Sequence, residues 1–333
     1  MNRGSRQAVR CLAVGQFPTP DLELIRQSIP AGQAELVLTE VGEDLARLGR
    51  FDMIWRLMPA EVDGVAHDQL AIALETHPEV DRVHTVSAGI DHLAALFADR
   101  PNIILTHSAG VTAIPIAEFV VGCLLQHCKR VAELADLQRE RRFVQLTLRE
   151  LGDMRVVLLG LGAIGSEVAR RLAPLRLPGG WGPAGSLAAD SSRCDPSLRI
   201  PGFGAVLQGR RCPNSGGTPN PRHRAGGERR GIGRACRGER AGERGPGRLV
   251  DEAALLAAVS AGRPVAAYLD AFVEEPLPDG SPLWTAPGVH VSPHLSWSSS
   301  HLARRTSDLF AGQLRRWLAG EPLRNRADPG AGY

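Results

Sequence analysis

The chain has 333 residues and a formal net charge of +3, and 43% of its residues are hydrophobic. This length allows two domains with separate cores, and this composition is typical of globular proteins. No apolar stretch reaches the roughly 18 residues of a membrane span, and the N-terminal apolar stretch is too short for a signal peptide. The six cysteines form neither a CxxC motif nor a disulfide framework. We therefore expect a cytoplasmic protein without membrane contact and without a metal site.

The charge is uneven along the chain. Residues 176–248 contain 14 Arg, no Lys and 5 acidic residues, a local net charge of +9, together with 17 Gly and 8 Pro. The rest of the chain is therefore acidic. This Arg/Gly-rich segment has no apolar periodicity, whereas the sequence on both sides of it does.

The first 106 residues alternate between short apolar runs and amphipathic stretches. This alternation predicts a small parallel sheet with helices on its faces. A longer apolar pattern follows and predicts a single helix over residues 116–134, with Pro115 at its start. The expected strands are residues 7–14, 34–38, 52–57, 83–87 and 102–106, and the expected helices are residues 21–28 and 67–74.

Residues 154–172 give the clearest indication of a binding site. An apolar run over 154–159 predicts a buried strand, and residues 164–172 have helical periodicity. The GxGxxG turn between them permits a tight bend and a close approach to a pyrophosphate, and the helix N-terminus attracts phosphate. An ordinary glycine-rich turn is the alternative, but the strand and the helix favour a dinucleotide site. This site is predicted to consist of Gly160, Gly162, Ala163, Ile164 and Gly165.

Regular patterns return at residue 249 and complete the domain organisation. They predict helices over 250–259 and 300–318 and strands over 265–269 and 289–292. The whole chain predicts an α/β fold with two Rossmann-like domains on doubly wound parallel sheets. We expect a substrate domain of residues 1–106 and 300–333, and a cofactor domain of residues 107–299. The Arg/Gly-rich segment interrupts the cofactor domain and is expected to be disordered or mistranslated.

Several motifs, and their order along the chain, resemble the D-isomer-specific 2-hydroxyacid dehydrogenases. This family includes phosphoglycerate dehydrogenase and the glyoxylate/hydroxypyruvate reductases. The resemblance extends from about residue 83 to the C-terminus, apart from the Arg/Gly-rich segment. The matching motifs are SAGIDHL (87–93), HSAGVTAIPIAEFVVGCLL (107–125), GLGAIG (160–165), LVDEAALLAAV (249–259), YLDAFVEEPLPDGSPLW (268–284), VSPHLS (291–296) and NRADPGAGY (325–333).

The resemblance implies hydride transfer between NAD or NADP and a small D-2-hydroxy or 2-keto acid, in a homodimer. His294 would be the general acid/base that protonates the keto oxygen, and Glu275 would hold its other nitrogen. An imidazole suits this role because it titrates near neutral pH. Taken alone, His294 could equally be a loop histidine and Glu275 a solvated acid.

The resemblance also assigns binding residues. The backbone of Ala88 and Gly89 would bind the substrate carboxylate, and glycine allows a close approach there. Thr112 and Asp270 would contact the nicotinamide end of the cofactor. Their alternative interpretations are a threonine that precedes a helix and a cap at the end of a strand.

The chain departs from the family directly before the helix over 250–259. The family has a catalytic arginine in an Asn-Val-Ala-Arg-Gly motif there, and Pro246 stands at its place. We hypothesise that residues of about 176–247 are translated in the wrong reading frame. A shift of one base lets LRLPGGWGPAG (175–185) encode the missing second strand, and GERGP (242–246) encode Gly-Asn-Val-Ala-Arg.

Two alternatives rank below the frameshift. A degenerate paralogue, acting as a non-catalytic protein that binds a ligand or a partner, comes second. A disordered RNA-binding insertion comes third, because the segment contains only Trp181 and Phe203 as aromatic residues for base stacking. The segment also replaces family elements, which an insertion does not do. As written, the chain is expected to be an impaired dehydrogenase that binds no nucleic acid.

Overall fold

The fold is known from a computed structural model. It divides into two compact units, residues Met1–Thr112 with Ser298–Tyr333 (unit 1) and Ala113–Trp297 (unit 2). Gly160 and, apart from 205–207, the Arg/Gly-rich segment lie outside the described residues. The structure describes residues 8–15, 23, 25–27, 32–39, 42–58, 60–62, 65–154, 156–158, 161–175, 205–207, 250–262 and 266–327.

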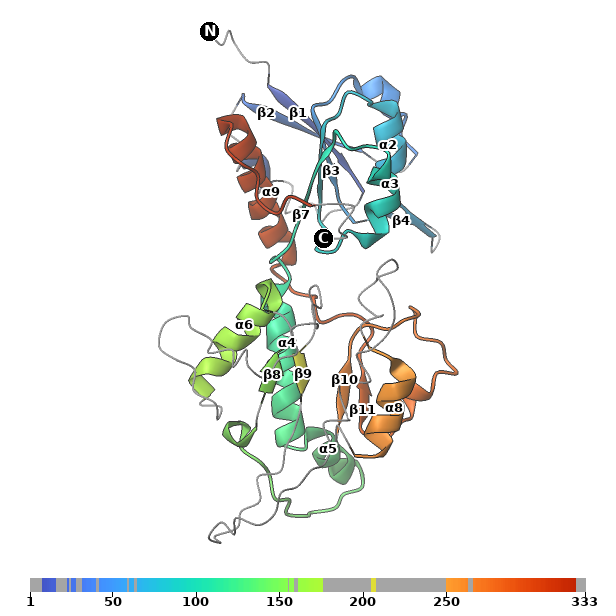
Figure 1. The fold of residues 1–333 in the computed structure, drawn as a ribbon, viewed down its shortest axis with the longest axis vertical. Coiled ribbons are helices and arrows are strands. Elements are labelled where there is room, and N and C mark those ends of the chain that lie inside the picture. Colours follow the sequence, from blue (N-terminus) through green and yellow to red (C-terminus); the bar gives the residue numbers. More distant parts are fainter. Residues whose placement is uncertain are drawn as a thin grey trace, which may run out of the picture. The chain divides into compact units, whose positions relative to one another are not determined.

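Unit 1 is built on a five-stranded parallel sheet with the order β2-β1-β3-β6-β7 (Figure 1). The order reverses at β1, as in doubly wound sheets, because the chain first adds a strand on one side and then builds outward on the other. This sheet confirms the predicted α/β class. The strands are β1 (Val9–Val14), β2 (Ala34–Leu38), β3 (Met53–Arg56), β6 (Arg82–Thr85) and β7 (Ile104–His107).

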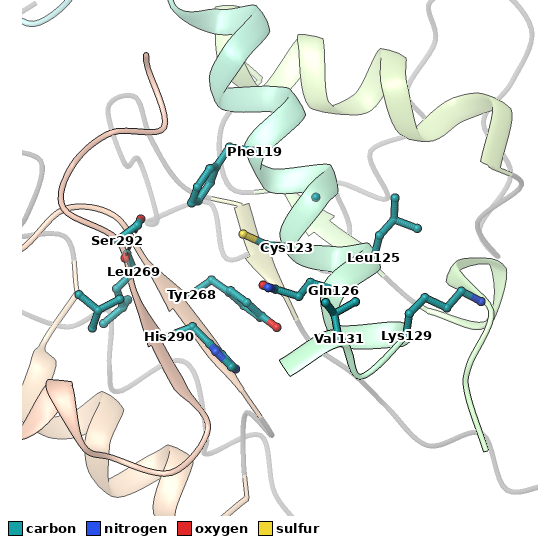
Figure 2. A pocket seen from close by; sticks show the side chains of 12 residues that line it. Phe119, Cys123, Leu125, Gln126, Lys129, Val131, Tyr268, Leu269, His290 and Ser292 are labelled. Carbon is teal, nitrogen blue, oxygen red and sulfur yellow. Dashed lines mark hydrogen bonds between the residues drawn. The ribbon is translucent and has the colours of Figure 1, made fainter. Parts of the chain in front are cut away.

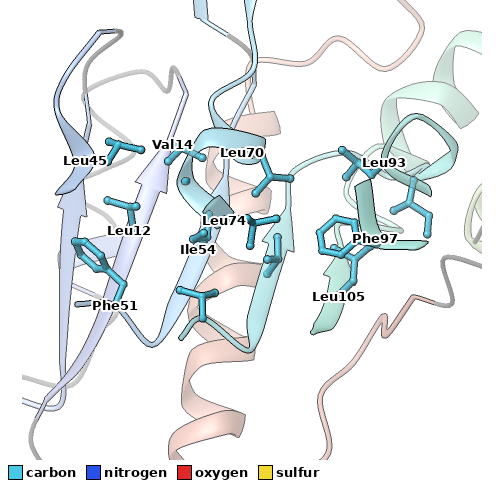
Figure 3. Close-up of a cluster of buried hydrophobic side chains, with 14 residues drawn as sticks. Leu12, Val14, Leu45, Phe51, Ile54, Leu70, Leu74, Leu93, Phe97 and Leu105 are labelled. Atoms are coloured by element: carbon cyan, nitrogen blue, oxygen red, sulfur yellow. The ribbon is translucent and has the colours of Figure 1, made fainter. Parts of the chain in front are cut away.

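Helices α2 (Leu70–Thr76) and α3 (Ala94–Ala98) cover one face of this sheet. Side chains alternate between the two faces of a strand, so Leu12 and Val14 of β1 point to the same side. They join a buried cluster with residues of both helices, which Figure 3 shows in close-up. The cluster consists of Leu12, Val14, Leu45, Phe51, Ile54, Leu70, Ala73, Leu74, Val80, Val83, Ile90, Leu93, Phe97 and Leu105.

The opposite face is covered by the last helix, α9 (Leu302–Ala319). The ring of Phe310 stacks on Trp55 of β3 with centroids 4.0 Å apart, and both side chains are fully buried. Parallel sheets need cover on both faces, so the chain end completes the core of unit 1. Residues 325–327 then run beside β7, where His107 N donates to the carbonyl of Asn325.

The remaining described elements of unit 1 are short. Strands β4 (Ala60–Val62) and β5 (Val65–His67) form an antiparallel hairpin that the sequence patterns did not predict. Three-residue strands are too short to show a period, which explains the omission. The 3₁₀ helices of this unit are Leu45–Leu48 and Asp91–Leu93.

Unit 2 begins with α4 (Ala113–Cys128), which packs on α6 (Ala163–Leu172) around a core that includes Leu124, Val168 and Leu172. The prediction of one helix over residues 116–134 is wrong. Arg130 has a left-handed backbone (φ 50°), so α4 ends and α5 (Val131–Arg139) starts in a new direction. Apolar periodicity does not register such a break, because both helices have apolar faces.

The described strands of unit 2 form two separate pairs. The pair β10 (Ala267–Leu269) and β11 (Val289–Val291) is parallel, whereas β8 (Val156–Leu158) and β9 (Ala205–Leu207) are antiparallel. Helix α8 (Glu252–Ser260) precedes β10. The 3₁₀ helices are Leu151–Asp153, Ala173–Leu175 and Pro282–Trp284. None of the helices in the described parts of either unit could cross a membrane.

We predict that Phe310→Ala destabilises unit 1 by about 3–5 kcal/mol, because it removes a fully buried ring from the Trp55 stack. Hydrogen exchange of the β1 and β3 amides would measure the loss. Ile72→Ala is the control, since the Ile72 side chain is 58% exposed and its loss should change stability by less than about 0.5 kcal/mol. Equal protection of these strands in both variants would contradict the role of α9 in the core.

Candidate functional site

The predicted catalytic pair lies in two loops of unit 2. Glu275 follows β10 and His294 follows β11, and these two strands are adjacent and parallel. The carboxyl ends of such strands meet at one edge of a sheet, where α/β proteins form their sites. His294 Nδ1 lies 2.7 Å from Glu275 Oε2. Because a carboxylate only accepts, Nδ1 carries a proton, and Nε2 has no hydrogen-bond partner among the described residues.

Neither member of this pair is buried. The side chains of His294 and Glu275 are 46% and 34% exposed. A half-exposed imidazole with one nitrogen held and the other open can exchange a proton with a bound small molecule. The geometry is that of an oriented general acid/base.

The carboxylate of Asp270 shapes the loop that carries His294. Oδ1 accepts from the hydroxyl of Ser292 at 2.5 Å and from the amide of Leu295 at 2.9 Å, and Oδ2 accepts from the amide of Ser296 at 3.0 Å. The bonds lie on both sides of His294, so Asp270 organises the whole turn. Asp270 was predicted from the resemblance as a cofactor contact, and these bonds add a positioning function that the sequence did not reveal.

His294 itself has an uncommon backbone conformation, with φ 49°. A left-handed conformation costs free energy in a residue with a side chain, and it persists only where the surroundings enforce it. Besides the Asp270 bonds, the indole nitrogen of Trp297 donates to the His294 carbonyl at 2.6 Å. The loop therefore maintains a strained turn that directs the imidazole to Glu275.

Glu275 is positioned from the helix that precedes β10. Asp251 caps α8 by accepting from the amide of Ala254 at 2.9 Å. Glu252, in the first turn of this helix, accepts from the amide of Val273 at 2.9 Å. Glu275 Oε1 in turn accepts from the amide of Phe272 at 2.9 Å. The loop over 271–275 is thus held at the amides of Phe272 and Val273, and Glu275 Oε2 contacts His294.

The described part of the glycine turn has the properties of a phosphate-binding helix start. Gly162 is the N-cap of α6, and no side chain caps the first turn, which contains Ala163, Ile164 and Gly165. A methyl group on the Gly162 Cα would meet no described atom within 4 Å, so the space beside it is open. Open space and uncapped N–H groups fit a dinucleotide pyrophosphate.

The predicted carboxylate-binding backbone lies in the loop after β6 in unit 1. The amide of Ser108 donates to the carbonyl of Ser87 at 3.0 Å, and His107 Nδ1 lies 2.7 Å from the carbonyl of Ala88. The buried guanidinium of Arg56 donates to the hydroxyl of Ser87 at 3.2 Å. These contacts hold the chain immediately before Gly89.

Arg56 is itself held by a carboxylate. Its Nη2 lies 2.6 Å from Oδ2 of Asp68, and Nε of the same guanidinium donates to that oxygen at 2.9 Å. Burial raises the pKa of Asp68, but the hydrogen bonds and the charge of Arg56 outweigh burial and bring it below its ordinary value. The sequence motifs did not identify Arg56 and His107 as site residues. Both stand at the carboxyl ends of apolar runs, where residues that bind ligands are expected in α/β sheets.

Unit 2 also has a cavity of about 520 Å³ between α4 and the β10–β11 pair (Figure 2). The rings of Tyr268 and His290 stack on the strand side, with centroids 4.3 Å apart, and Cys123 lies on the helix side. Burial raises the pKa of Tyr268 to about 12 and that of Cys123 to about 11, and it lowers the pKa of His290. All three groups are uncharged near neutral pH. The described residues contain no cluster of metal-binding side chains.

A family model matches two stretches of unit 2. The model described as "D-isomer specific 2-hydroxyacid dehydrogenase, NAD binding domain" matches residues 121–178 and 244–296. Over these two stretches the chain is similar to this dehydrogenase family. The two matched stretches contain the glycine turn, Glu275 and His294, and they leave residues 179–243 unmatched.

Relatives with assigned activities extend the similarity to most of the chain. A glyoxylate reductase of Thermofilum pendens is 27% identical over 266 residues, which cover 75% of this chain and 76% of the relative. The human glyoxylate reductase/hydroxypyruvate reductase is 28% identical over 255 residues, which cover 72% of this chain and 75% of the relative.

A solved structure of the family has the same fold. The D-isomer specific 2-hydroxyacid dehydrogenase of Xanthobacter autotrophicus Py2, in complex with NADPH and MES, is 25% identical, with a TM-score of 0.65. The match covers 98% of this chain and 100% of the other. These comparisons confirm the resemblance and the two Rossmann-like domains predicted from the motifs.

The structure assigns the predicted site residues to two separate sets. Ala88, Gly89 and Thr112 belong to unit 1, where Thr112 is half-buried directly before α4. The described residues of the glycine turn belong to unit 2 with the catalytic pair and Asp270, and Gly160 lies outside the described residues. Within unit 2, Asp270, Glu275 and His294 form one connected hydrogen-bonded group with Ser292 and the loop amides.

We predict that Asp270→Ala loosens the His294 loop, because two backbone amides and a hydroxyl lose their acceptor. Hydrogen exchange of residues 291–297 should become at least tenfold faster, which corresponds to about 1.4 kcal/mol. Asp270→Asn, which retains one acceptor oxygen, should have an intermediate effect. Asp279→Ala is the matched control on the same exposed loop. Unchanged exchange in Asp270→Ala would contradict the positioning role.

Proposed function

We propose that this chain is built to reduce small 2-keto acids to D-2-hydroxy acids with NADH or NADPH, and that its Arg/Gly-rich segment impairs this activity. The observation that carries the proposal is the oriented His294–Glu275 pair, with its 2.7 Å contact, on loops that the family model matches. Glyoxylate and hydroxypyruvate are the first substrates to test, because they appear in the names of the relatives.

The chain's own residues would act as follows. The backbone at Ala88 and Gly89 binds the substrate carboxylate by hydrogen bonds. His294 Nε2 donates a proton to the keto oxygen, which becomes the hydroxyl of the product, and Glu275 stabilises the imidazolium before the transfer. In the reverse direction His294 accepts the hydroxyl proton. Asp270 and Trp297 keep the imidazole in place throughout.

The cofactor site is proposed at the start of α6. Gly162, Ala163, Ile164 and Gly165 would hold the pyrophosphate, and Thr112 and Asp270 would contact the nicotinamide end. When bound, the reduced nicotinamide supplies the hydride that the keto carbon accepts. The uncapped helix start and the open space beside Gly162 support this assignment.

Three observations support impairment. Pro246 stands where the family has its arginine, and proline has no side-chain donor for a carboxylate or a carbonyl. The family model does not match residues 179–243. Among the described strands, β8 and β10 belong to different sheets, whereas a doubly wound domain joins such strands in one sheet.

The cavity in Figure 2 is also consistent with impairment. It lies against the β10–β11 pair, and strands of a parallel sheet are normally covered on both faces. The uncharged Tyr268, His290 and Cys123 side chains suit contact with apolar protein atoms.

We also propose that the chain forms a homodimer through the segment over residues 140–150. This segment connects α5 to the next 3₁₀ helix without regular structure, and its Phe143 side chain is 99% exposed. Val144 and Leu148 are 43% and 42% exposed. A cluster of exposed large apolar side chains on one segment is typical of an interface, and a second copy of the chain is the proposed cover.

The reading-frame proposal predicts a large difference between two proteins. The chain as written should oxidise NADH and NADPH slowly with glyoxylate or hydroxypyruvate, and its frame-corrected version should be active. In the corrected protein, His294→Ala should lower turnover by about 10²–10⁴-fold while cofactor binding persists, because a positioned general acid is lost.

Absorbance at 340 nm would measure the rates, and fluorescence of the bound reduced cofactor would measure the affinity. Comparable rates in the two proteins would show that the Arg/Gly-rich segment is a working part of the enzyme. Unchanged turnover in His294→Ala would remove this residue from the mechanism. A corrected protein that binds cofactor but reduces none of several 2-keto acids would favour a non-catalytic, ligand-binding function.

The dimer proposal predicts that Phe143→Ser weakens self-association. Sedimentation velocity should show a dimer for the parent chain and a shift towards monomer for the variant, because a fully exposed aromatic anchor is lost. Ile72→Ser, at another exposed apolar side chain, is the control and should remain dimeric. A parent chain that sediments as a monomer at all concentrations would contradict the proposal.

A further inference from the structure

We propose that His107 is a positioning residue for the carboxylate-binding backbone at Ala88 and Gly89. This inference rests on the proposed function, since it assumes that the loop after β6 binds the substrate carboxylate. It adds a residue that the sequence motifs did not assign. The contacts from which it is argued all lie in unit 1, whose sequence the reading-frame hypothesis does not change.

The topology brings His107 beside this loop. Strands β6 and β7 are adjacent and parallel, and their register pairs Thr85 with His107, the last residue of each strand. The chain after Thr85 and the side chain of His107 therefore share the carboxyl edge of the sheet. His107 Nδ1 lies 2.7 Å from the carbonyl oxygen of Ala88.

This hydrogen bond defines the state of the imidazole. A carbonyl only accepts, so Nδ1 carries the proton and Nε2 is the second, open nitrogen, without a hydrogen-bond partner among the described residues. Burial lowers the pKa of His107 and outweighs the opposing effect of the Ala88 carbonyl. The ring is neutral near pH 7 and still donates to Ala88, because the Nδ1–H tautomer needs no positive charge.

The other contacts on the loop hold Ser87 and leave Ala88 to His107. Arg56 binds the Ser87 hydroxyl, Ser108 binds the Ser87 carbonyl, and the Ser87 amide donates to the Thr85 hydroxyl at 3.3 Å. The next residue, Gly89, has no side chain through which it could be held. Among the side-chain contacts of the described residues, the bond from His107 to the Ala88 carbonyl is therefore the nearest one that precedes Gly89, whose amide is predicted to bind the carboxylate.

His107 can serve as a rigid support because its own position is fixed from two sides. Its amide donates to the carbonyl of Asn325 at 3.0 Å, and Asn325 Nδ2 donates to the carbonyl of Ala109 at 3.0 Å. Beneath the loop, the buried His84 bridges the two hydroxyls of Thr106 and Ser108. The C-terminal segment and this buried group together hold the end of β7.

Among the described residues, the groups that shift the pKa of His107 or form hydrogen bonds with it are uncharged near neutral pH. Burial lowers the pKa of His84 to about 3, so this neighbour is neutral in the working pH range. The other contacts come from the neutral Ala88 carbonyl of the β6 loop and the Asn325 backbone of the C-terminal segment.

The test compares His107→Leu, which cannot donate, with His107→Asn, whose amide nitrogen can replace Nδ1. The frame-corrected full chain, loaded with NADPH, is titrated with oxamate, an unreactive analogue of glyoxylate. ¹⁵N-glycine labelling then reports on the Gly89 amide. We expect binding to weaken roughly 3- to 10-fold in His107→Leu, the effect of one lost hydrogen bond, and to recover in His107→Asn. KM for glyoxylate should rise by a similar factor with little change in kcat.

Two further measurements separate positioning from stability. Hydrogen exchange of β6 and β7 should be the same in the parent and both variants, and ¹⁵N-histidine spectra of the chain as written should show the Nδ1–H tautomer of His107. His301→Leu, an exposed histidine before α9, is the control and should bind oxamate as the parent does.

The outcomes distinguish this inference from the proposed function. Oxamate affinity and KM that are unchanged in His107→Leu, an Nε2–H tautomer, or a failure of His107→Asn to restore binding would each overturn the positioning role. If the parent protein itself binds oxamate without a shift at Gly89, the carboxylate assignment of the loop fails, and the His107 role fails with it. If the parent binds neither oxamate nor NADPH, the proposed function is wrong.

Discussion

A parallel β-sheet must be covered on both faces, and most features of this chain follow from that constraint. In unit 1, α2 and α3 cover one face and α9 covers the other, so the last helix of the chain completes a core that the first strands begin. The Trp55–Phe310 stack is the centre of the second layer. Because the helices cover both faces, the carboxyl edge of the sheet is the part left available for a binding site. Arg56, the loop after β6 and His107 lie together at this edge.

The same constraint explains the importance of the Arg/Gly-rich segment. The elements on either side of it match the family model, and they include the helix start at Gly162 and the loop in which His294 contacts Glu275. The described strands of unit 2, of which β9 lies within the segment, form two small pairs, and the cavity lies against the β10–β11 pair. A change of reading frame in this segment would remove strands of the unit 2 sheet and the arginine that the family has at the place of Pro246. The loops that hold His294 and Glu275 depend on residues outside the segment.

Within these loops, carboxylates act mainly as acceptors that organise backbone. Asp270 holds the turn around His294, Glu252 holds the amide of Val273, and Glu275 uses one oxygen for the Phe272 amide and the other for His294. Each bond between a carboxylate and an amide is charge-assisted and stronger than a neutral pair. The Asp270 bonds on both sides of His294 help to maintain its left-handed backbone.

The sequence by itself indicated the family resemblance and determined the α/β class and the order of most helices and strands, because apolar runs, glycine turns and motif residues are local signals. His294 and Glu275 were also named from motifs, although only the structure brings them to 2.7 Å. The local signals failed where the chain changes direction. The apolar periodicity over 116–134 continues through Arg130, but the left-handed backbone of this residue divides the stretch into α4 and α5. The tertiary structure alone decided which residues meet across strands, such as Asp270 with the His294 turn and His107 with Ala88. Such pairs are 19 to 26 residues apart in the chain, and sheet register, which no local pattern encodes, brings them together.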